Sequence, residues 1–300
     1  MDRKKDRRGK LRVLPAEATP ENAPRPDFCK TQKDATGLLA VPSEDGTYTK
    51  FKAPGLAGVV AGTGSDDMFD PVSLLEMPAD GTAMCKHGVT VQAWIIGPWF
   101  VKRICHGNIL KAFRHLLEAP RPMIALRAAK RLAEIGIPTP SVAAALRRYR
   151  LGLPQYDYLV TGALPPSAVF ADKLPRTKEL AERLTALLAQ LHDRGVEHGD
   201  ASLRNFYRAD GNKFGVIHLD ACRINGSPLP RRRRIRELAR LASSFAKLAA
   251  ERKTENLPGD IAGYFAELYA RYSGTLPDSP AYRRRFLYLA ERKRKEYVRS

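Results

Sequence analysis

The chain has 300 residues, with 51 lysines and arginines against 32 aspartates and glutamates, which gives a formal net charge of +19 at pH 7. Hydrophobic residues make up 44% and charged residues 28% of the chain, values that are ordinary for a globular protein and exclude wholesale disorder. No uncharged apolar run reaches the roughly 18 residues of a membrane span. The four cysteines form no C-x-x-C pair, which argues against a zinc site and a disulfide framework and indicates a reducing, cytoplasmic environment.

The positive charge is concentrated in three segments. Residues 1–12 carry a net charge of +5, residues 231–240 carry +5 and residues 281–300 carry +6, so these three segments hold +16 of the total +19. A charge gathered in this way predicts a surface that meets polyanions rather than a uniformly basic chain.

Residues 1–66 are predicted to be a tail that is disordered or loosely docked. The segment contains many prolines, glycines and charged residues and no sustained hydrophobic period, so it cannot bury enough apolar surface to offset the entropy of ordering. Strands are predicted next at 90–96 and 99–104, which are rich in β-branched and aromatic residues and are separated by the turn dipeptide Gly97-Pro98.

Two helical segments follow, and the second is opened by Pro122 and closed by Gly136. Strands predicted around 141–148 and 156–161 then complete a small β-rich lobe, which is expected to cover residues 67–163.

The second half of the chain, residues 164–300, is predicted to be a mainly helical lobe. Its first helix follows Thr177, a residue suited to capping, and carries a wide apolar stripe of leucines between residues 180 and 191. A short hairpin and further helices follow, and the last, basic helix begins at Pro280. The expected fold class is therefore α+β, with a small β-rich N-lobe and a mainly helical C-lobe.

The segment from His198 to Asn205 reads H-G-D-x-x-x-x-N, and the strand predicted after it ends in Asp220. Phosphoryl transfer needs an acceptor hydroxyl held in line and metal ions that neutralise the phosphate oxygens. Mg²⁺ prefers hard oxygen ligands, so Asn205 and Asp220 are candidate ligands, and Asp200 is the candidate residue that orients or deprotonates the hydroxyl. The alternative is turn chemistry, because aspartate and asparagine favour loops in any protein.

Lys102 lies within the predicted strand at 99–104, a setting similar to that of the lysine that contacts nucleotide phosphates in kinases. A strand lysine is often only a solvent-exposed residue. Its assignment to the nucleotide therefore depends on the motif that follows downstream.

These motifs resemble those of the lipopolysaccharide core kinases of Gram-negative bacteria, which include the Kdo and heptose kinases and have a protein-kinase-like fold. Other phosphotransferases share H-G-D-x-x-x-x-N, so the resemblance depends on further segments between about residues 66 and 245. These segments are Asp70-Pro71, Leu74-Leu75, 86–88, 99–103, 136–140, 158–161 and 238–241. The sequences G-I-P-T-P at 136–140 and Y-L-V-T at 158–161 favour the core kinases within that fold.

The resemblance implies ATP and Mg²⁺ as cofactors and a role for each matching residue. Lys102 would contact the nucleotide phosphates and Asp200 would be the catalytic aspartate. Asn205 and Asp220 would hold Mg²⁺.

Further roles are implied for residues around this set. Lys86 and Gly88 would belong to a turn that covers the phosphates, and Thr161 to the hinge segment that meets adenine. His198 would support the turn that carries Asp220, whereas His218 is expected to pack within its strand.

The chain departs from the kinase pattern at three places. The helix that should supply an acidic partner for Lys102 has Ala125 near that position, which leaves Glu118 as a weak substitute. The residues after Asp220 are not Phe-Gly, and a glycine rather than an arginine precedes Asp200. A catalytically weak member of the family or a pseudokinase is therefore an alternative.

The basic segments are expected to face a polyanionic acceptor. Arg204, Arg231 and Arg232 are candidate acceptor-binding residues, and the last helix is expected to lie on the anionic surface of the inner membrane. The expected activity is ATP-dependent transfer of phosphate to a Kdo or heptose hydroxyl of a lipopolysaccharide core or lipid A acceptor, by a peripheral enzyme on the cytoplasmic side.

Two other functions are alternatives at this stage. One is an atypical protein kinase or small-molecule kinase of the same fold, and the other is a basic module that binds membranes without catalysis. No nucleic-acid partner is expected, because the chain has no helix-turn-helix, zinc or aromatic-platform signature.

Overall fold

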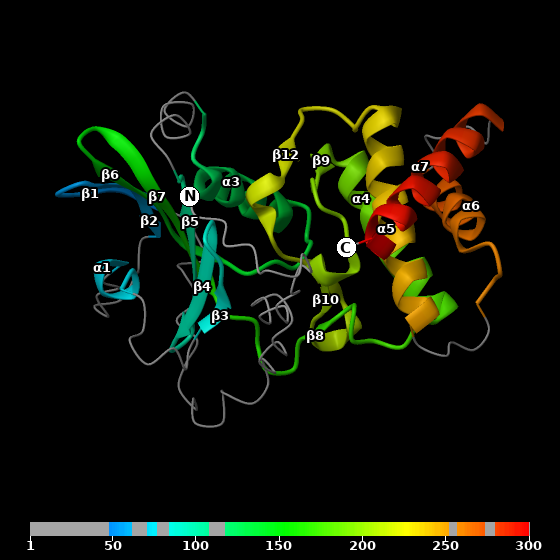
Figure 1. Ribbon diagram of the computed structural model, residues 1–300, viewed down its shortest axis with the longest axis horizontal. Helices are drawn as coiled ribbons and strands as arrows, with labels where there is room; N and C mark the ends of the chain where they lie inside the picture. Colours follow the sequence, from blue (N-terminus) through cyan, green and yellow to red (C-terminus); the bar gives the residue numbers. More distant parts are fainter. Residues whose placement is uncertain are drawn as a thin grey trace, which may run out of the picture.

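The computed structural model describes residues 48–61, 71–76, 84–107, 118–251, 257–273 and 280–299. They form two lobes, which Figure 1 shows side by side: a β-sheet with one long helix, and a group of helices with short strands. The α+β, two-lobed architecture expected from the sequence is confirmed. None of the described helices contains an apolar stretch long enough to cross a membrane.

The small lobe is built on one antiparallel sheet of seven strands in the order β1-β2-β6-β7-β5-β4-β3. The strands are β1 (Tyr48–Ala53), β2 (Leu56–Ala61), β3 (Met84–His87), β4 (Val91–Ile96), β5 (Trp99–Cys105), β6 (Val142–Arg150) and β7 (Leu153–Gly162). A short helix, α1 (Pro71–Leu74), and the longer α3 (Arg121–Glu134) belong to the same lobe. The predicted strand pairs β4–β5 and β6–β7 are confirmed, and the second pair is longer than predicted.

The tail predicted over residues 1–66 is wrong for residues 48–61. Strands β1 and β2 pair along their whole lengths and β2 continues onto β6, so this hairpin forms one edge of the sheet. Leu56 on β2 is buried in the small-lobe core with Trp94, and this packing outweighs the glycines and alanines that obscured the strand pattern. The rest of the predicted tail and the first predicted helix of this lobe lie outside the described residues.

The large lobe contains four helices among the described residues, joined by short strands and turns. The helices are α4 (Lys178–Asp193), α5 (Arg231–Glu251), α6 (Ile261–Ser273) and α7 (Pro280–Arg299). The strands are β8 (Val169–Phe170), β9 (Val196–Glu197), β10 (Phe206–Arg208), β11 (Phe214–Val216) and β12 (Arg223–Ile224). Helix α4 begins as predicted, because the Thr177 hydroxyl oxygen accepts a hydrogen bond of 3.1 Å from the backbone N–H of Leu180.

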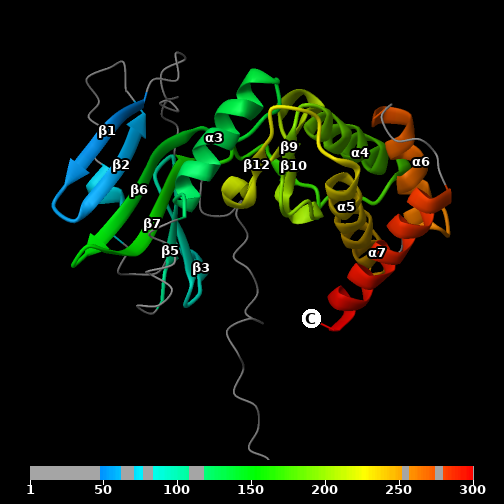
Figure 2. The ribbon, with the colours of Figure 1, turned by 90° about the horizontal axis from the view of Figure 1, so that it is seen from above.

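The core of the large lobe extends to the sheet through α3. Buried leucines of α4 pack with Phe245 of α5, Phe265 of α6 and Phe286 of α7, and the same cluster includes Leu132 of α3 and Leu159 of β7. Figure 2 shows α3 between the sheet and the helices, and α6 and α7 at the end of the molecule farthest from the sheet. Helix α3 is therefore the element whose packing connects the two lobes.

A buried ion pair lies inside the small lobe between β6 and β7. The fully buried Asp157 carboxylate accepts hydrogen bonds from Nε (2.6 Å) and Nη2 (3.1 Å) of Arg147, and Nε2 of His106 lies 3.2 Å from it. Burial alone would raise the pKa of Asp157, but hydrogen bonds from His106 and Arg147 hold the pKa below its ordinary value. The sheet therefore contains a buried, ionised carboxylate that depends on the Arg147 guanidinium group and on the hydrogen bond from His106.

Replacing Arg147 by alanine should lower the free energy of unfolding by about 3–5 kcal/mol, because it removes one partner of a buried charge. Arg148→Ala on the same strand is the matched control, since Arg148 is exposed, and should change stability by less than about 0.5 kcal/mol. Urea unfolding followed by circular dichroism measures both. Equal losses for the two variants would contradict this account of the sheet.

Candidate active site

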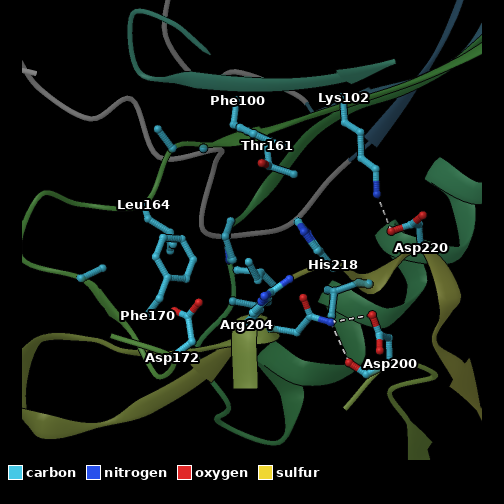
Figure 3. A pocket seen from close by; sticks show the side chains of 18 of the residues that line it. Phe100, Lys102, Thr161, Leu164, Phe170, Asp172, Asp200, Arg204, His218 and Asp220 are labelled. Atoms are coloured by element: carbon cyan, nitrogen blue, oxygen red, sulfur yellow. Dashed lines mark hydrogen bonds and ion pairs between the residues drawn. The ribbon is translucent and has the colours of Figure 1, made fainter. Parts of the chain in front are cut away.

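A cleft of about 1010 Å³ opens between the two lobes and is lined by residues of both. The sequence-predicted site residues that line it are Lys86, Lys102 and Thr161 from the small lobe and Asp200, Arg204, Asn205 and Asp220 from the large lobe. Figure 3 shows Lys102 and Asp220 on one side of the cleft and Asp200 below them. Residues more than 100 positions apart in the sequence thus meet in one cleft.

Lys102 and Asp220 form an ion pair across the cleft. Nζ of Lys102 donates a hydrogen bond of 2.8 Å to Oδ1 of Asp220, and the two side chains are only 12% and 13% exposed. Lys102 is placed by β5, which lies between β4 and β7 in the sheet. Burial alone would raise the pKa of Asp220, but the Lys102 ammonium group outweighs burial and lowers it, so the carboxylate is ionised.

Helix α3 supplies no acid to this ion pair. Ala125, which is fully buried, lines the cleft at the helix position where kinases carry an acidic partner for the strand lysine, and Glu118 is exposed ahead of the helix. Helix α3 instead packs against the 3₁₀ turn at Leu219–Ala221, which carries Asp220. The partner of Lys102 therefore comes from the turn and not from the helix.

We call residues 198–205 the H-G-D loop. Its Asn205 donates hydrogen bonds from Nδ2 to the backbone oxygen of Asp200 at 2.7 Å and to Oδ2 of Asp200 at 3.0 Å. Gly199 has φ = 83°, and a Cβ atom there would lie 2.4 Å from the backbone oxygen of Ala221. The loop thus requires glycine before Asp200, because its backbone is pressed against the turn that carries Asp220.

One face of α5 holds the H-G-D loop. The two carboxylate oxygens of Glu237 accept hydrogen bonds of 2.7 Å from the backbone N–H groups of His198 and Gly199. Arg240 donates to the backbone oxygen of Gly199 and lies 3.5 Å from Oδ1 of Asp200. Further along α5, the Ser244 hydroxyl oxygen accepts a hydrogen bond of 3.1 Å from the backbone N–H of Leu203 in the loop. The spacing of 237, 240 and 244 is that of one helical face.

Glu237 is also joined to a buried polar network. His192 donates from Nε2 to Glu237 at 3.4 Å and accepts from the Tyr269 hydroxyl at Nδ1 at 2.6 Å. Burial lowers the pKa of His192, so the imidazole is neutral. Burial alone would raise the pKa of Glu237, but hydrogen bonds from His192 and the His198 backbone lower it. Sequence reasoning missed Glu237, although an acid among the buried leucines of a basic amphipathic helix was a signal.

The two histidines near the cleft have different environments. His198 is buried and supports the neighbouring turn as expected, since Nε2 donates to the backbone oxygen of Ile217 at 2.9 Å. His218 was expected to pack within a strand, and this is wrong: it follows β11 in a left-handed conformation and its side chain lines the cleft. The His218 side chain is exposed in the cleft. Partial desolvation by the surrounding cleft and the charge of Lys102 lower the pKa of its imidazole to about 4.

The remaining predicted site residues are only partly gathered at the cleft. Gly88 lies in the turn between β3 and β4 but does not line the cleft. Arg231 and Arg232 are exposed at the start of α5, about 24 Å along the helix from Lys247, the α5 residue that lines the cleft. Their position therefore does not support contact with an acceptor inside the cleft.

Glu237→Gln should destabilise the protein and slow its reaction. The substituted side chain has one acceptor oxygen for two backbone donors, which should lower the free energy of unfolding by about 1–3 kcal/mol, and displacement of the loop should lower kcat at least about tenfold. Glu179→Gln, an exposed residue of α4, is the control and should change neither quantity. Urea unfolding and steady-state kinetics measure the two effects, and wild-type behaviour of the Glu237 variant would refute the anchoring role.

Comparison with known proteins places these features in a family. The model of the Lipopolysaccharide kinase (Kdo/WaaP) family matches residues 82–261. A search of curated proteins found no match. A solved structure of WaaP in complex with acyl carrier protein is 22% identical, with 71% of this chain and 87% of that chain covered and a TM-score of 0.49.

Other similar solved structures include a kinase–inhibitor complex and a kinase domain. A co-crystal structure of WbdD with the kinase inhibitor LY294002 is 16% identical, with 70% of this chain and 44% of that chain covered and a TM-score of 0.42. The ROP18 kinase domain in complex with AMP-PNP and sucrose is 12% identical, with 72% and 82% covered and a TM-score of 0.42. The family model matches more than half of the chain, including the H-G-D loop, Lys102 and Asp220, and the chain therefore belongs to the lipopolysaccharide kinase (Kdo/WaaP) family.

Proposed function

We propose that this kinase uses ATP to phosphorylate a sugar hydroxyl, of Kdo or heptose, in the inner core of lipopolysaccharide. The observation that carries the proposal is the convergence of Lys102, Asp200, Asn205 and Asp220 on one cleft between the lobes. A lone turn-forming aspartate would not account for this arrangement, because Lys102 on the sheet meets Asp220, which lies 118 positions farther along the chain.

The chain's own residues divide the work of phosphoryl transfer. Asp200, held by Asn205, would orient the acceptor hydroxyl and receive its proton. Lys102 would contact nucleotide phosphates, and the apolar side chains of Val142 and Leu159 offer a surface for a nucleobase. The oxygen donors of Asn205 and Asp220 suit a hard divalent cation such as Mg²⁺, which would neutralise phosphate charge when bound.

An anionic acceptor fits the charge of the cleft better than a cationic one. Lys86, Lys173, Arg204 and Lys247 all line it, so phosphate or carboxylate groups on the acceptor would find cations nearby. A cationic substrate such as an aminoglycoside would be repelled by the same residues. This charge distribution supports the lipopolysaccharide acceptor over a small cationic one.

Contact with an anionic membrane surface would be electrostatic. The apolar face of α7 is not available for insertion, because Phe286 and Ala290 are buried in the core of the large lobe. The exposed residues Arg231, Arg232 and Arg236 on α5 instead offer charges that would each contribute about 1 kcal/mol near anionic lipid. We propose a peripheral enzyme on the cytoplasmic face of the inner membrane.

Asp200→Asn should lower the rate of transfer to purified lipopolysaccharide core by about 10²-fold or more, because the amide cannot accept the hydroxyl proton. Nucleotide binding, followed by thermal shift, should remain. Asp210→Asn, an exposed change on a neighbouring turn, is the matched control and should transfer at the wild-type rate. Unimpaired transfer by the Asp200 variant would contradict the proposed function.

Charge reversal at Arg231 and Arg232 should weaken binding to vesicles that contain anionic lipid by at least about tenfold, since two charges near the surface are inverted. Arg234 is left unchanged because it is buried and bonded to Asp193 and Ser273. The matched control inverts Lys178 and Lys213, which are exposed elsewhere on the lobe. Vesicle co-sedimentation measures the effect, and equal losses in both double variants would argue against a defined membrane-facing surface.

A further inference from the structure

The two oxygens of the Asp200 carboxylate have different neighbours. Oδ2 accepts the hydrogen bond of 3.0 Å from Asn205, whereas Oδ1 lies 3.5 Å from Nη1 of Arg240 on α5. Asn205 lines the cleft between the lobes, and Arg240 does not. The Asp200 side chain is 54% exposed, so an incoming hydroxyl can reach Oδ1 from outside. The acceptor therefore has its access to Asp200 on the side of Arg240, away from the part of the cleft that would hold the nucleotide.

Arg240 has hydrogen-bonding capacity beyond its contacts with the H-G-D loop. The hydrogen bond to the backbone oxygen of Gly199 and the ion pair with Asp200 both use Nη1. Among the described residues, no partner is found for Nε or Nη2, and 28% of the side chain is exposed. Nε and Nη2 form one edge of the planar guanidinium group, and such an edge binds a carboxylate or phosphate with two parallel hydrogen bonds. Arg240 can thus hold the loop and bind an anion at the same time.

A second cation lies beside Arg240 on the same helix. Arg236 is four residues earlier on α5, which places it one turn away on the same face, and its side chain is exposed. Within the part of the chain that the structure describes, Arg236 has no hydrogen bond or ion pair. Like charges four residues apart destabilise a helix slightly, and an anion bound between the two arginines would remove that repulsion.

An acceptor bound for reaction would bring its own substituents to these arginines. A hydroxyl that donates to Oδ1 of Asp200 at ordinary hydrogen-bond distance lies no more than about 6 Å from Nη1 of Arg240. A charged group on the same sugar ring, or on the next one, is then within reach of the guanidinium edge. The cations that line the cleft, such as Lys86 and Lys102, also face the nucleotide and so discriminate less between acceptors.

We propose that Arg240 and Arg236 form an anion-binding subsite for the acceptor, which binds a carboxylate or phosphate group close to the hydroxyl that Asp200 orients. The acceptor class is therefore an acidic or phosphorylated sugar, and a neutral sugar chain should be a poor substrate. This inference deepens the proposed function and rests on it for the role of Asp200. The subsite takes the place of Arg231 and Arg232, which lie farther from the H-G-D loop along α5.

The test uses the deacylated oligosaccharide of the lipopolysaccharide inner core as a soluble acceptor. It is prepared in three forms: intact, with its carboxyl groups reduced to alcohols, and with its phosphates removed. Calorimetry gives the affinity of each form for the ADP-bound protein, and steady-state kinetics with ATP give kcat/KM for transfer. One of the two modified forms should bind wild-type protein at least about tenfold more weakly than the intact form, because charge-assisted hydrogen bonds are lost. The form that loses affinity identifies the group as carboxylate or phosphate.

Two variants assign this loss to the arginines. Arg240→Lys keeps a positive charge but lacks the planar edge, and Arg236→Gln removes a charge that holds no part of the loop. In each variant the affinity ratio between the intact and the modified form should fall to about threefold or less, with the KM for ATP changed by less than about twofold. Arg127→Gln, at an exposed arginine of α3, is the matched control and should keep the wild-type ratio. A purely structural Arg240 would weaken all three forms equally, and an unchanged ratio in both variants would overturn the proposal.

Binding and transfer together separate this subsite from the proposed function. Binding that depends on the two arginines, without phosphate transfer, would leave the subsite standing and refute the kinase reaction on this acceptor. Transfer with the same acceptor preference in wild type and in both variants would support the proposed function and overturn the subsite. Absence of both binding and transfer would refute both.

Discussion

A buried carboxylate, that of Glu237, holds the H-G-D loop, which carries Asp200, the residue proposed to orient the acceptor hydroxyl. Backbone N–H groups that leave water must find acceptors, and those of His198 and Gly199 find both oxygens of one side chain. Because Glu237 is on α5, a helix of 21 residues packed in the large-lobe core, its hydrogen bonds fix the loop to that core. His192 and Tyr269 complete the surroundings of Glu237, so the buried charge is surrounded by donors and not by hydrocarbon alone.

The loop is then fixed from its other side by the turn that carries Asp220. Gly199 approaches Ala221 too closely for any side chain, and His198 bonds to the backbone just before the turn. Helix α3 packs on the same turn and also belongs to the core that extends into the sheet. The Lys102–Asp220 ion pair thus joins two elements whose positions are set independently, one by the sheet and one by this stack of loop, turn and helix.

The basic residues of the chain serve several different purposes, although they look alike in the sequence. In the run at 231–234, Arg231 and Arg232 are exposed, Arg233 pairs with Glu197 at 3.1 Å, and Arg234 is buried and bonded to several partners. Arg240, on the same helix, meets the loop backbone instead. The net charge therefore overstates the surface available to a polyanion, because part of it stabilises the interior.

The sequence by itself determined the two-lobed fold class, most of the strands and helices, and the candidate residues Lys102, Asp200, Asn205 and Asp220. These follow from local signals: periodicity, turn residues and a motif with fixed spacing, each of which is encoded within a few neighbouring positions. Only the tertiary structure showed that residues 48–61 belong to the sheet, that Glu237 anchors the loop, that Asp220 pairs with Lys102, and that His218 faces the cleft. The first three depend on contacts between segments that are distant in the sequence. The fourth depends on the left-handed backbone of His218, which ends the strand and turns the side chain toward the cleft. A local sequence pattern cannot predict these features, because the segments whose packing fixes them lie elsewhere in the chain.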